Sequence, residues 1–421
     1  MTTIHDAAAA MGPGPLTEGG LRQHIAPLFS RALAGDKARR EIYLANHSLG
    51  RPLDRTADDI AGALDLWYTD MDGAWSAWMD AMDDYRARVA RLVGRSRPDA
   101  VVPKTAAGQG FRAVLNALPH QAPHVVATAG EFDSIDFTLR TYARKRRARV
   151  TWVKPDDTGL FHAQDIVDAI TDDTDLVMVS HAIFATGQII EDIGAVVTAA
   201  HAHNAEIVLD TYHTAGVLPL SERGGLDELG VDFAIGGNYK YTRGGPGACW
   251  LSIHDRHLRD AGPAPAGSLY TLDTGWFAKH NTFAYERPET PELSAGGDAW
   301  LESTPPFLLP YQARAGLELV EAIGVGRLRA YNLRQQAVLA EALRSRGIEP
   351  RLIEPRGAFL LVPHPDAMEM SRRLKDAGVN TDARPCPSGK TAHVRLCPDI
   401  LNTEAELHRA AEIMAGLLAP R

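Results

Sequence analysis

The middle of the chain alternates short apolar runs with amphipathic stretches, and this alternation restricts the fold more than any other feature. The apolar runs are rich in valine, isoleucine and leucine, and they fall at 125–128, 150–153, 176–179, 207–209, 233–235 and 248–251. Between most of them apolar residues recur at helical spacing, as they do at 193–203. Such an alternation predicts an α/β fold, with a mostly parallel sheet and helices on both faces.

The rest of the sequence divides the chain into three predicted parts. We expect an N-terminal leader and helical segment at 1–70, a large sheet-bearing domain at 71–305, and a smaller C-terminal α/β domain at 306–421. The last part predicts a long helix at about 311–346, a strand at 359–362, and helices at 368–377 and 403–419. Residues 1–20 carry an alanine run without a basic head, so a flexible leader is expected rather than a signal peptide.

Charge and cysteine content exclude several classes of function. The net charge of −9 argues against nonspecific binding to nucleic acid or to anionic membranes. No apolar run has the length of a membrane span. The cysteines Cys249, Cys386 and Cys397 are widely spaced and lack histidines at metal-ligand spacing. We therefore expect a cytoplasmic protein with no metal site and no disulfide framework.

The segment 236–247 places Lys240 between two tyrosines and surrounds it with glycines. Apolar runs lie on both sides, so the segment is expected to join two buried strands. Lysines are rarely enclosed in this way without a chemical reason. Burial lowers the pKa of an amine and makes it a nucleophile suited to Schiff-base chemistry. Lys240 is thus a candidate anchor for an aldehyde cofactor; the alternative is a surface lysine on a hairpin.

A second candidate site lies about thirty residues upstream. The apolar run 207–209 ends at Asp210, and His213 follows in the next turn. Ligands collect at the carboxyl ends of parallel strands, where a carboxylate can hold a protonated ring nitrogen. His213 could orient Asp210 or contact the ring. Alternatively, Asp210 caps a turn and His213 packs in the core, but together with Lys240 they favour a site.

These residues carry a resemblance to a known family. The matching segments are Asp210 to Gly216, Tyr239-Lys240-Tyr241, the glycines at 244–247, 43–50, Ser180-His181, and 394–398. Together they resemble kynureninase and its relatives in the class V branch of fold-type I pyridoxal-phosphate enzymes. The resemblance implies a seven-stranded, mostly parallel sheet flanked by helices, a smaller C-terminal domain, and pyridoxal 5'-phosphate as cofactor.

The resemblance also implies roles for individual residues around the cofactor. Lys240 would hold the cofactor and shuttle protons, Asp210 would bind the ring nitrogen, and His213 would contact the ring. Tyr239 matches a tyrosine that contacts the phosphate and transfers protons, and Phe132 matches an aromatic residue that stacks on the ring. Lys240, Tyr239 and Asp210 are therefore the expected catalytic residues.

The phosphate is expected at the start of a helix near residue 107. Ala106 and Ala107 are small enough to let backbone amides approach it. Relatives usually have a hydroxyl residue at Ala107, a role that Thr105 could take. Trp276 and Thr304 resemble residues that reach the phosphate or substrate, the tryptophan often from a partner subunit. A plain helix cap and a core aromatic residue are the alternatives for these positions.

One acidic position of the family is missing. Kynureninases carry an aspartate three residues after the stacking aromatic, where it joins the network around the pyridine nitrogen. Ile135 stands at that position here, and Asp136 follows it. Asp136 could fill the role if the turn were longer by one residue.

The substrate side of the site is expected to involve Arg395 and Ser48. A guanidinium binds a carboxylate bidentately, so Arg395 is the candidate for the α-carboxylate of an amino acid. Ser48 lies in the matching N-terminal segment. The basic stretch that kynureninases carry after their first helix is replaced by the tryptophan-containing segment 72–79, which suits an aryl substrate but departs from the family pattern.

The implied activity is hydrolytic cleavage of the Cβ–Cγ bond of an aryl-ketone L-amino acid, L-kynurenine or an analogue, as in tryptophan catabolism. A class V aminotransferase, epimerase or lyase acting on another amino acid is the alternative. A non-catalytic α/β binding protein is a third possibility, from a different class. The family implies a homodimer with shared active sites, whose partner is a small amino acid rather than nucleic acid or a membrane.

Overall fold

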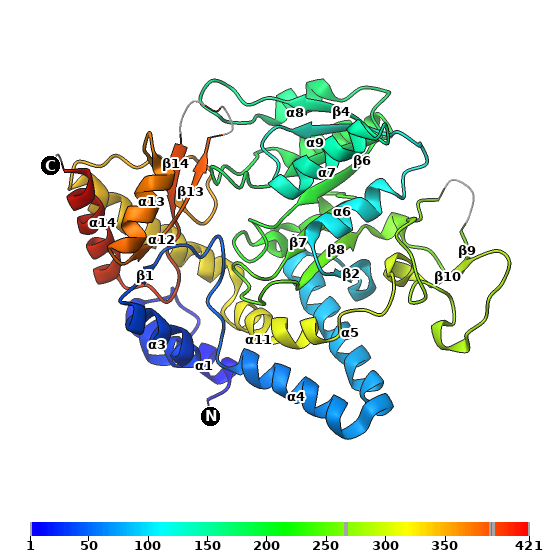
Figure 1. Cartoon of the computed structure of the whole chain (residues 1–421), viewed down its shortest axis with the longest axis horizontal. Coiled ribbons are helices and arrows are strands. Elements are labelled where there is room, and N and C mark those ends of the chain that lie inside the picture. Colours follow the sequence, from blue (N-terminus) through cyan, green and yellow to red (C-terminus); the bar gives the residue numbers. More distant parts are fainter. Residues whose placement is uncertain (1, 265–267, 387–388, 390–391, 420–421) are drawn as a thin grey trace.

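The computed structural model describes residues 2–264, 268–386, 389 and 392–419, and its centre is one seven-stranded sheet (Figure 1). The strand order is β2-β8-β7-β6-β5-β3-β4. The strands are β2 (Val101–Lys104), β3 (His124–Thr128), β4 (Arg149–Val153), β5 (Leu176–Ser180), β6 (Glu206–Asp210), β7 (Phe233–Gly237) and β8 (Cys249–Ile253). Strands β4, β3, β5, β6 and β7 run parallel, and β8 runs antiparallel to both its neighbours. The predicted mostly parallel sheet is confirmed.

Helices cover both faces of this sheet because its strands are apolar on both sides. Val126 and Val177 face one core, which α8 (Ala163–Ala169) and α9 (Ile193–Ala202) complete. The alternate residues Val125 and Leu176 face the other core, together with α6 (Ala107–Leu115) and α7 (Asp133–Arg144). Parallel strands buried on both faces have this continuous apolar character.

The C-terminal residues build a second, smaller sheet at one side of the molecule (Figure 1). Its antiparallel strands lie in the order β11-β14-β13. They are β11 (Leu360–Pro363), β13 (Asp382–Pro385) and β14 (Ala392–Leu396), and the helices that share their core are α12 (Val325–Arg344), α13 (Ala367–Asp376) and α14 (Glu404–Leu418). Strand β1 (Ile42–Tyr43) pairs with β12 (Val379–Asn380), which ties the N-terminal segment to this part.

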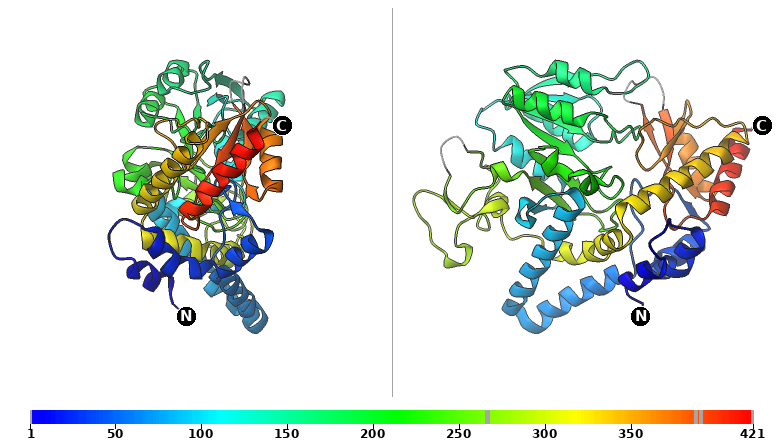
Figure 2. Two further views of the ribbon diagram at one scale, coloured as in Figure 1. Left: turned by 90° about the vertical axis from the view of Figure 1, so that its left-hand side faces the viewer. Right: turned by 180° about the vertical axis from the view of Figure 1, so that it is seen from behind.

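Further helices and strands surround these two sheets. They are α2 (Glu18–Gly20), α3 (Ser30–Arg39), α4 (Arg55–Asp70), α5 (Ala74–Val93), α10 (Gly225–Glu228), β9 (Gly262–Pro263) and β10 (Glu292–Leu293). Helices α4 and α5 form a pair that projects from the body of the molecule (Figure 2). Among the helices of the described residues, none is both long and apolar enough to cross a membrane.

Two predictions for the helical parts were wrong. The expected flexible leader contains α1 (Ile4–Ala10), which begins at a capping box of Thr3 and Asp6. One face of the alanine run is buried against α11 (Leu308–Ile323), so the run is amphipathic rather than free. The expected helix at 311–346 is two helices, α11 and α12, because Gly324 between them adopts φ 91°, a conformation that favours glycine.

Candidate active site

A cavity opens where the carboxyl ends of the central parallel strands meet the start of α6. Its volume is about 770 Å³, including the part open to solvent. Asp210 ends β6 and lies in register with Ser180, which ends β5. Phe132 follows β3, and Lys240 follows β7. All four residues line the cavity, as expected for the carboxyl edge of an α/β sheet.

Lys240 lies in the turn between β7 and β8, here called the lysine turn (residues 238–247). Its side chain is 5% exposed, and its Nζ lies 2.7 Å from Nε2 of His213. Gly50 packs directly on this turn, because a Cβ at Gly50 would come within 1.9 Å of the Lys240 carbonyl oxygen. The N-terminal segment that contains Gly50 thus holds the backbone of the lysine in place.

Burial sets the charge of the amine. Desolvation lowers the pKa of Lys240 to about 7, the nearby Arg395 acts in the same direction, and Asp210 opposes them. The Nζ atom lies 4.8 Å from the centroid of the Tyr212 ring and 5.6 Å from that of Tyr239. A substantial share of the amine is therefore neutral and nucleophilic at neutral pH.

Asp210 and His213 line the same cavity as Lys240, so the structure brings these three predicted residues together. One carboxylate oxygen of Asp210 accepts a hydrogen bond of 2.8 Å from the Tyr212 amide, and burial raises the pKa of Asp210 to about 6. Burial and the positive charge of Lys240 hold the pKa of His213 well below its usual value. The neutral ring accepts from Lys240 at Nε2, so Nδ1 carries the proton and donates to the Tyr241 hydroxyl, 3.2 Å away.

The opposite end of the cavity is the start of α6. Ala106 and Ala107 line it, and among the described residues no side chain makes a capping hydrogen bond at this helix start. The Thr105 hydroxyl donates to the Gln109 side chain at 3.1 Å. An uncapped helix start lined by small residues is a suitable site for a phosphate.

Aromatic and aliphatic side chains form the cavity wall. Phe132 and Phe184 meet edge to face, with ring centroids 5.2 Å apart. Ile135 also lines the cavity and is 1% exposed. Asp136 accepts a hydrogen bond of 2.7 Å from Arg140 on the same helix and is not among the lining residues. The structure therefore does not bring Asp136 to the position that Ile135 occupies.

The candidate substrate residues lie next to the cavity rather than in its lining. Arg395, on β14, is buried, pairs with Asp382 and donates to the backbone oxygen of Phe184. The Ser48 hydroxyl donates to the same Asp382 carboxylate. Although burial alone would raise the pKa of Asp382, contacts with His47 and Arg395 hold it well below its usual range. The ion pair with Asp382 thus fixes the orientation of the Arg395 guanidinium.

Two sequence candidates lie away from the cavity of their own chain. The Trp276 indole donates to the Thr304 hydroxyl at 3.2 Å. Trp276 packs edge to face on Trp75 and Phe283, in an aromatic cluster next to α5. The structure brings Trp276 and Thr304 together, but not to Lys240.

Two residues in or next to the cavity were not predicted from the sequence. Tyr212, between Asp210 and His213, lines the cavity, and its hydroxyl lies 3.4 Å from the Cys249 sulfur. Glu131 is buried at the end of β3 and bonds to Ser180. The position of Glu131, three residues after an apolar strand and directly before Phe132, is the signal that could have identified it.

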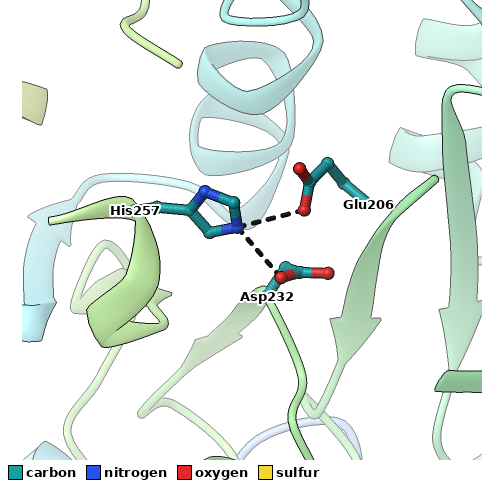
Figure 3. A group of neighbouring side chains, drawn as sticks. All are labelled: Glu206, Asp232 and His257. Carbon is teal, nitrogen blue, oxygen red and sulfur yellow. Dashed lines mark hydrogen bonds and ion pairs between the residues drawn. The ribbon is translucent and has the colours of Figure 1, made fainter. Parts of the chain in front are cut away.

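A separate polar cluster lies near the start of β6 and consists of Glu206, Asp232 and His257 (Figure 3). His257 Nε2 lies 2.9 Å from Asp232 and 3.0 Å from Glu206. The three ligand atoms are close enough together to hold a metal ion. Arg256, however, already forms ion pairs with both carboxylates. We therefore interpret the cluster as a structural ion-pair network.

This cluster predicts a pH-dependent contribution to stability. Burial alone would lower the pKa of His257, but its bonds to Asp232 and Glu206 raise it above the ordinary value. A raised folded-state pKa stabilises the protein below the unfolded pKa, and the effect is lost as pH rises through the folded value. His257→Gln should lower the free energy of unfolding by about 1–2 kcal/mol near pH 6 and by clearly less near pH 9. Urea unfolding at both pH values tests this; an equal loss at both would contradict it.

Comparisons with known proteins extend these observations. The pattern of the family described as aminotransferase class-V matches residues 70–355. A kynureninase of Geobacillus thermodenitrificans is 28% identical over 402 residues, covering 90% of this chain and 88% of the relative. An apo cysteine desulfurase from Thermococcus onnurineus NA1 has a TM-score of 0.75 at 18% identity, over 90% of this chain and 94% of that one. A C-DES mutant with glycine covalently linked to its PLP cofactor has a TM-score of 0.76 at 17% identity, over 89% and 96%. The two solved structures show the shared fold.

Proposed function

Because the chain belongs to the class-V aminotransferase family, we propose that it is a kynureninase-like hydrolase that cleaves the Cβ–Cγ bond of an aryl-ketone L-amino acid. The cofactor is pyridoxal 5'-phosphate. The observation that carries the proposal is the buried Lys240 amine, which lies in hydrogen-bond contact with His213 in a cavity that Asp210 also lines. L-Kynurenine or an analogue is the proposed substrate class.

The residues present fit this cofactor. Lys240 offers an amine that is partly neutral at neutral pH, and the uncapped start of α6 offers amides to a phosphate. Asp210 offers a buried carboxylate to a protonated ring nitrogen. The bound cofactor supplies an electron sink for the substrate carbanion.

The chain's own groups would bind the substrate and move its protons. The Arg395 guanidinium, held by Asp382, would take the α-carboxylate in bidentate form. Lys240 Nζ would move the proton at the substrate α-carbon. The Tyr239 hydroxyl, whose pKa is raised by burial, stays protonated at neutral pH and would serve as an acid near the γ-carbonyl. Phe132 would stack on the cofactor ring, and Phe184 would pack against the aryl group.

Product analysis tests the proposed hydrolysis. With L-kynurenine or 3-hydroxykynurenine, the cofactor-loaded protein should consume one water and release alanine and an aromatic acid, anthranilate or 3-hydroxyanthranilate, detectable by mass spectrometry. A loaded protein that releases no aromatic acid from either compound would contradict the hydrolase assignment while leaving the cofactor site intact.

A second function within the family is favoured by two departures from the kynureninase pattern. Ile135 replaces the second acid of kynureninases, and the family's basic stretch is absent at 72–79. Both changes suit an aminotransferase, epimerase or lyase acting on a different amino acid. Accumulation of the pyridoxamine form of the cofactor, with a panel of amino acids, would identify the aminotransferase. Desulfurase chemistry is disfavoured because burial raises the pKa of Cys249, which lines the cavity, so that its thiol stays protonated at neutral pH.

We also propose that the protein is a cytoplasmic homodimer with shared active sites. Trp276 and Thr304 do not reach the cavity of their own chain, so they are available to the cavity of a second subunit. The neighbouring surface exposes large apolar side chains, namely Trp67, Tyr68, Met71, Phe283 and Tyr285. Exposed apolar surface of this kind is typical of protein interfaces.

A hybrid experiment tests the shared sites. Lys240→Ala and Trp276→Ala subunits should each be impaired as homodimers. Co-expression should restore roughly a quarter of wild-type activity, because half of the random dimers are mixed and each mixed dimer has one complete site. Activity no higher than that of the separate variants would contradict shared sites.

A further inference from the structure

Glu131 is a buried carboxyl group next to the active-site cavity with no assigned role. It is 4% exposed and lies just after β3. Its carboxylate accepts three hydrogen bonds: 2.6 Å from the Thr128 hydroxyl, 2.6 Å from the Ser180 hydroxyl and 3.1 Å from the Ser180 amide. Each of these donors is neutral, and among the described contacts no lysine or arginine pairs with Glu131.

Such a group is expensive to bury for structural reasons alone. Burial raises the pKa of Glu131 to about 7, against the effect of its hydrogen bonds, and the charge of Asp210 adds to the rise. An uncharged side chain such as glutamine could accept hydrogen bonds between β3 and β5 without the penalty of a buried charge. Perturbed carboxyl groups at the edge of a cavity are frequent at functional sites.

The geometry connects Glu131 to the cofactor pocket through Ser180. Ser180 lines the cavity and lies in register with Asp210 on the neighbouring strand. A serine hydroxyl has one proton, and that of Ser180 is donated to Glu131. The oxygen of Ser180 therefore presents lone pairs, not a proton, to any group beside Asp210.

We propose that Glu131 is a positioning residue that replaces the acid missing at Ile135. It fixes Ser180 as a hydrogen-bond acceptor and places a second negative charge beside Asp210, so that the cofactor ring is held in its protonated form. The negative charge is supplied by Glu131, which lies between β3 and Phe132. It is not supplied by a residue of α7, the helix that follows Phe132. This inference rests on the cofactor site of the proposed function, and not on the reaction performed there.

The test compares Glu131→Gln with wild type in two cofactor-dependent measurements. The first is the dissociation constant of pyridoxal phosphate, measured by titrating the apo protein. The second is the pH midpoint at which the absorbance of the lysine-bound cofactor changes. Removing a nearby negative charge should weaken binding by about tenfold and shift the midpoint to lower pH by about half a pH unit. Ser180→Ala should weaken binding in the same direction.

The control is Glu318→Gln, which alters a buried carboxylate outside the cavity lining, paired with Arg55. It should lower the melting temperature of the apo protein and leave both cofactor measurements unchanged. If Glu131→Gln behaves like this control, Glu131 only fastens β3 to β5, and the inference is wrong. If wild type shows no absorbance band of a lysine-bound cofactor, the proposed site itself fails, which is a separate outcome.

Discussion

Lys240→Ala should abolish turnover, with a loss of at least about a thousandfold, and should remove the absorbance band of the lysine-bound cofactor. The amine is buried, its pKa is lowered by burial, and it contacts His213 in a cavity that Asp210 also lines, so we propose it as the nucleophile. Without it the cofactor would lose its covalent anchor, and the group proposed to move the proton at the substrate α-carbon would be lost. Initial rates and absorbance spectra of the purified variant measure both effects.

The matched control is Lys154→Ala, which removes an exposed lysine outside the cavity. It should keep the activity and the spectrum of wild type. If Lys240→Ala retained more than about a tenth of wild-type turnover, another amine would be the anchor, and the account of the lysine turn would be wrong.

Asp210→Asn should lower turnover by about a hundredfold or more, with a smaller effect on protein stability. The amide oxygen of asparagine can still accept the bond from the Tyr212 backbone, so the local turn is preserved. The neutral side chain, however, cannot stabilise a positive charge on the ring nitrogen, and the cofactor becomes a weaker electron sink.

The measurement is turnover together with the melting temperature of the apo protein. Turnover should fall while the melting temperature stays within a few degrees of wild type. Turnover within about threefold of wild type would show that Asp210 does not contact the cofactor ring.

The sheet could be predicted from the sequence because its signal is local. Each central strand is a short apolar run, and each following helix has its own apolar spacing. The lysine turn was predicted for the same reason, since two buried strands, β7 and β8, flank a glycine-rich segment. The resemblance then identified the family, which the comparisons confirm.

The features that the sequence did not predict depend on contacts between segments that are far apart in the sequence or on the direction of a side chain. The N-terminal alanine run was not predicted as a packed helix, because the surface that buries one of its faces belongs to α11, about 300 residues away in the sequence. Asp136 could not replace Ile135, because successive side chains on a helix turn by about 100° and Asp136 lies on another face of α7. The proposed role of Glu131 depends on its hydrogen bond with Ser180, which is 49 residues away in the sequence.

The roles of the individual site residues stay predictions, and one measurement addresses the central one directly. The cofactor-loaded protein is reduced with borohydride, digested, and mapped by peptide mass spectrometry. We expect a phosphopyridoxyl group on Lys240, within the peptide that contains Tyr239 and Tyr241. A modification on another lysine, or none in a protein that shows the cofactor's absorbance, would contradict it.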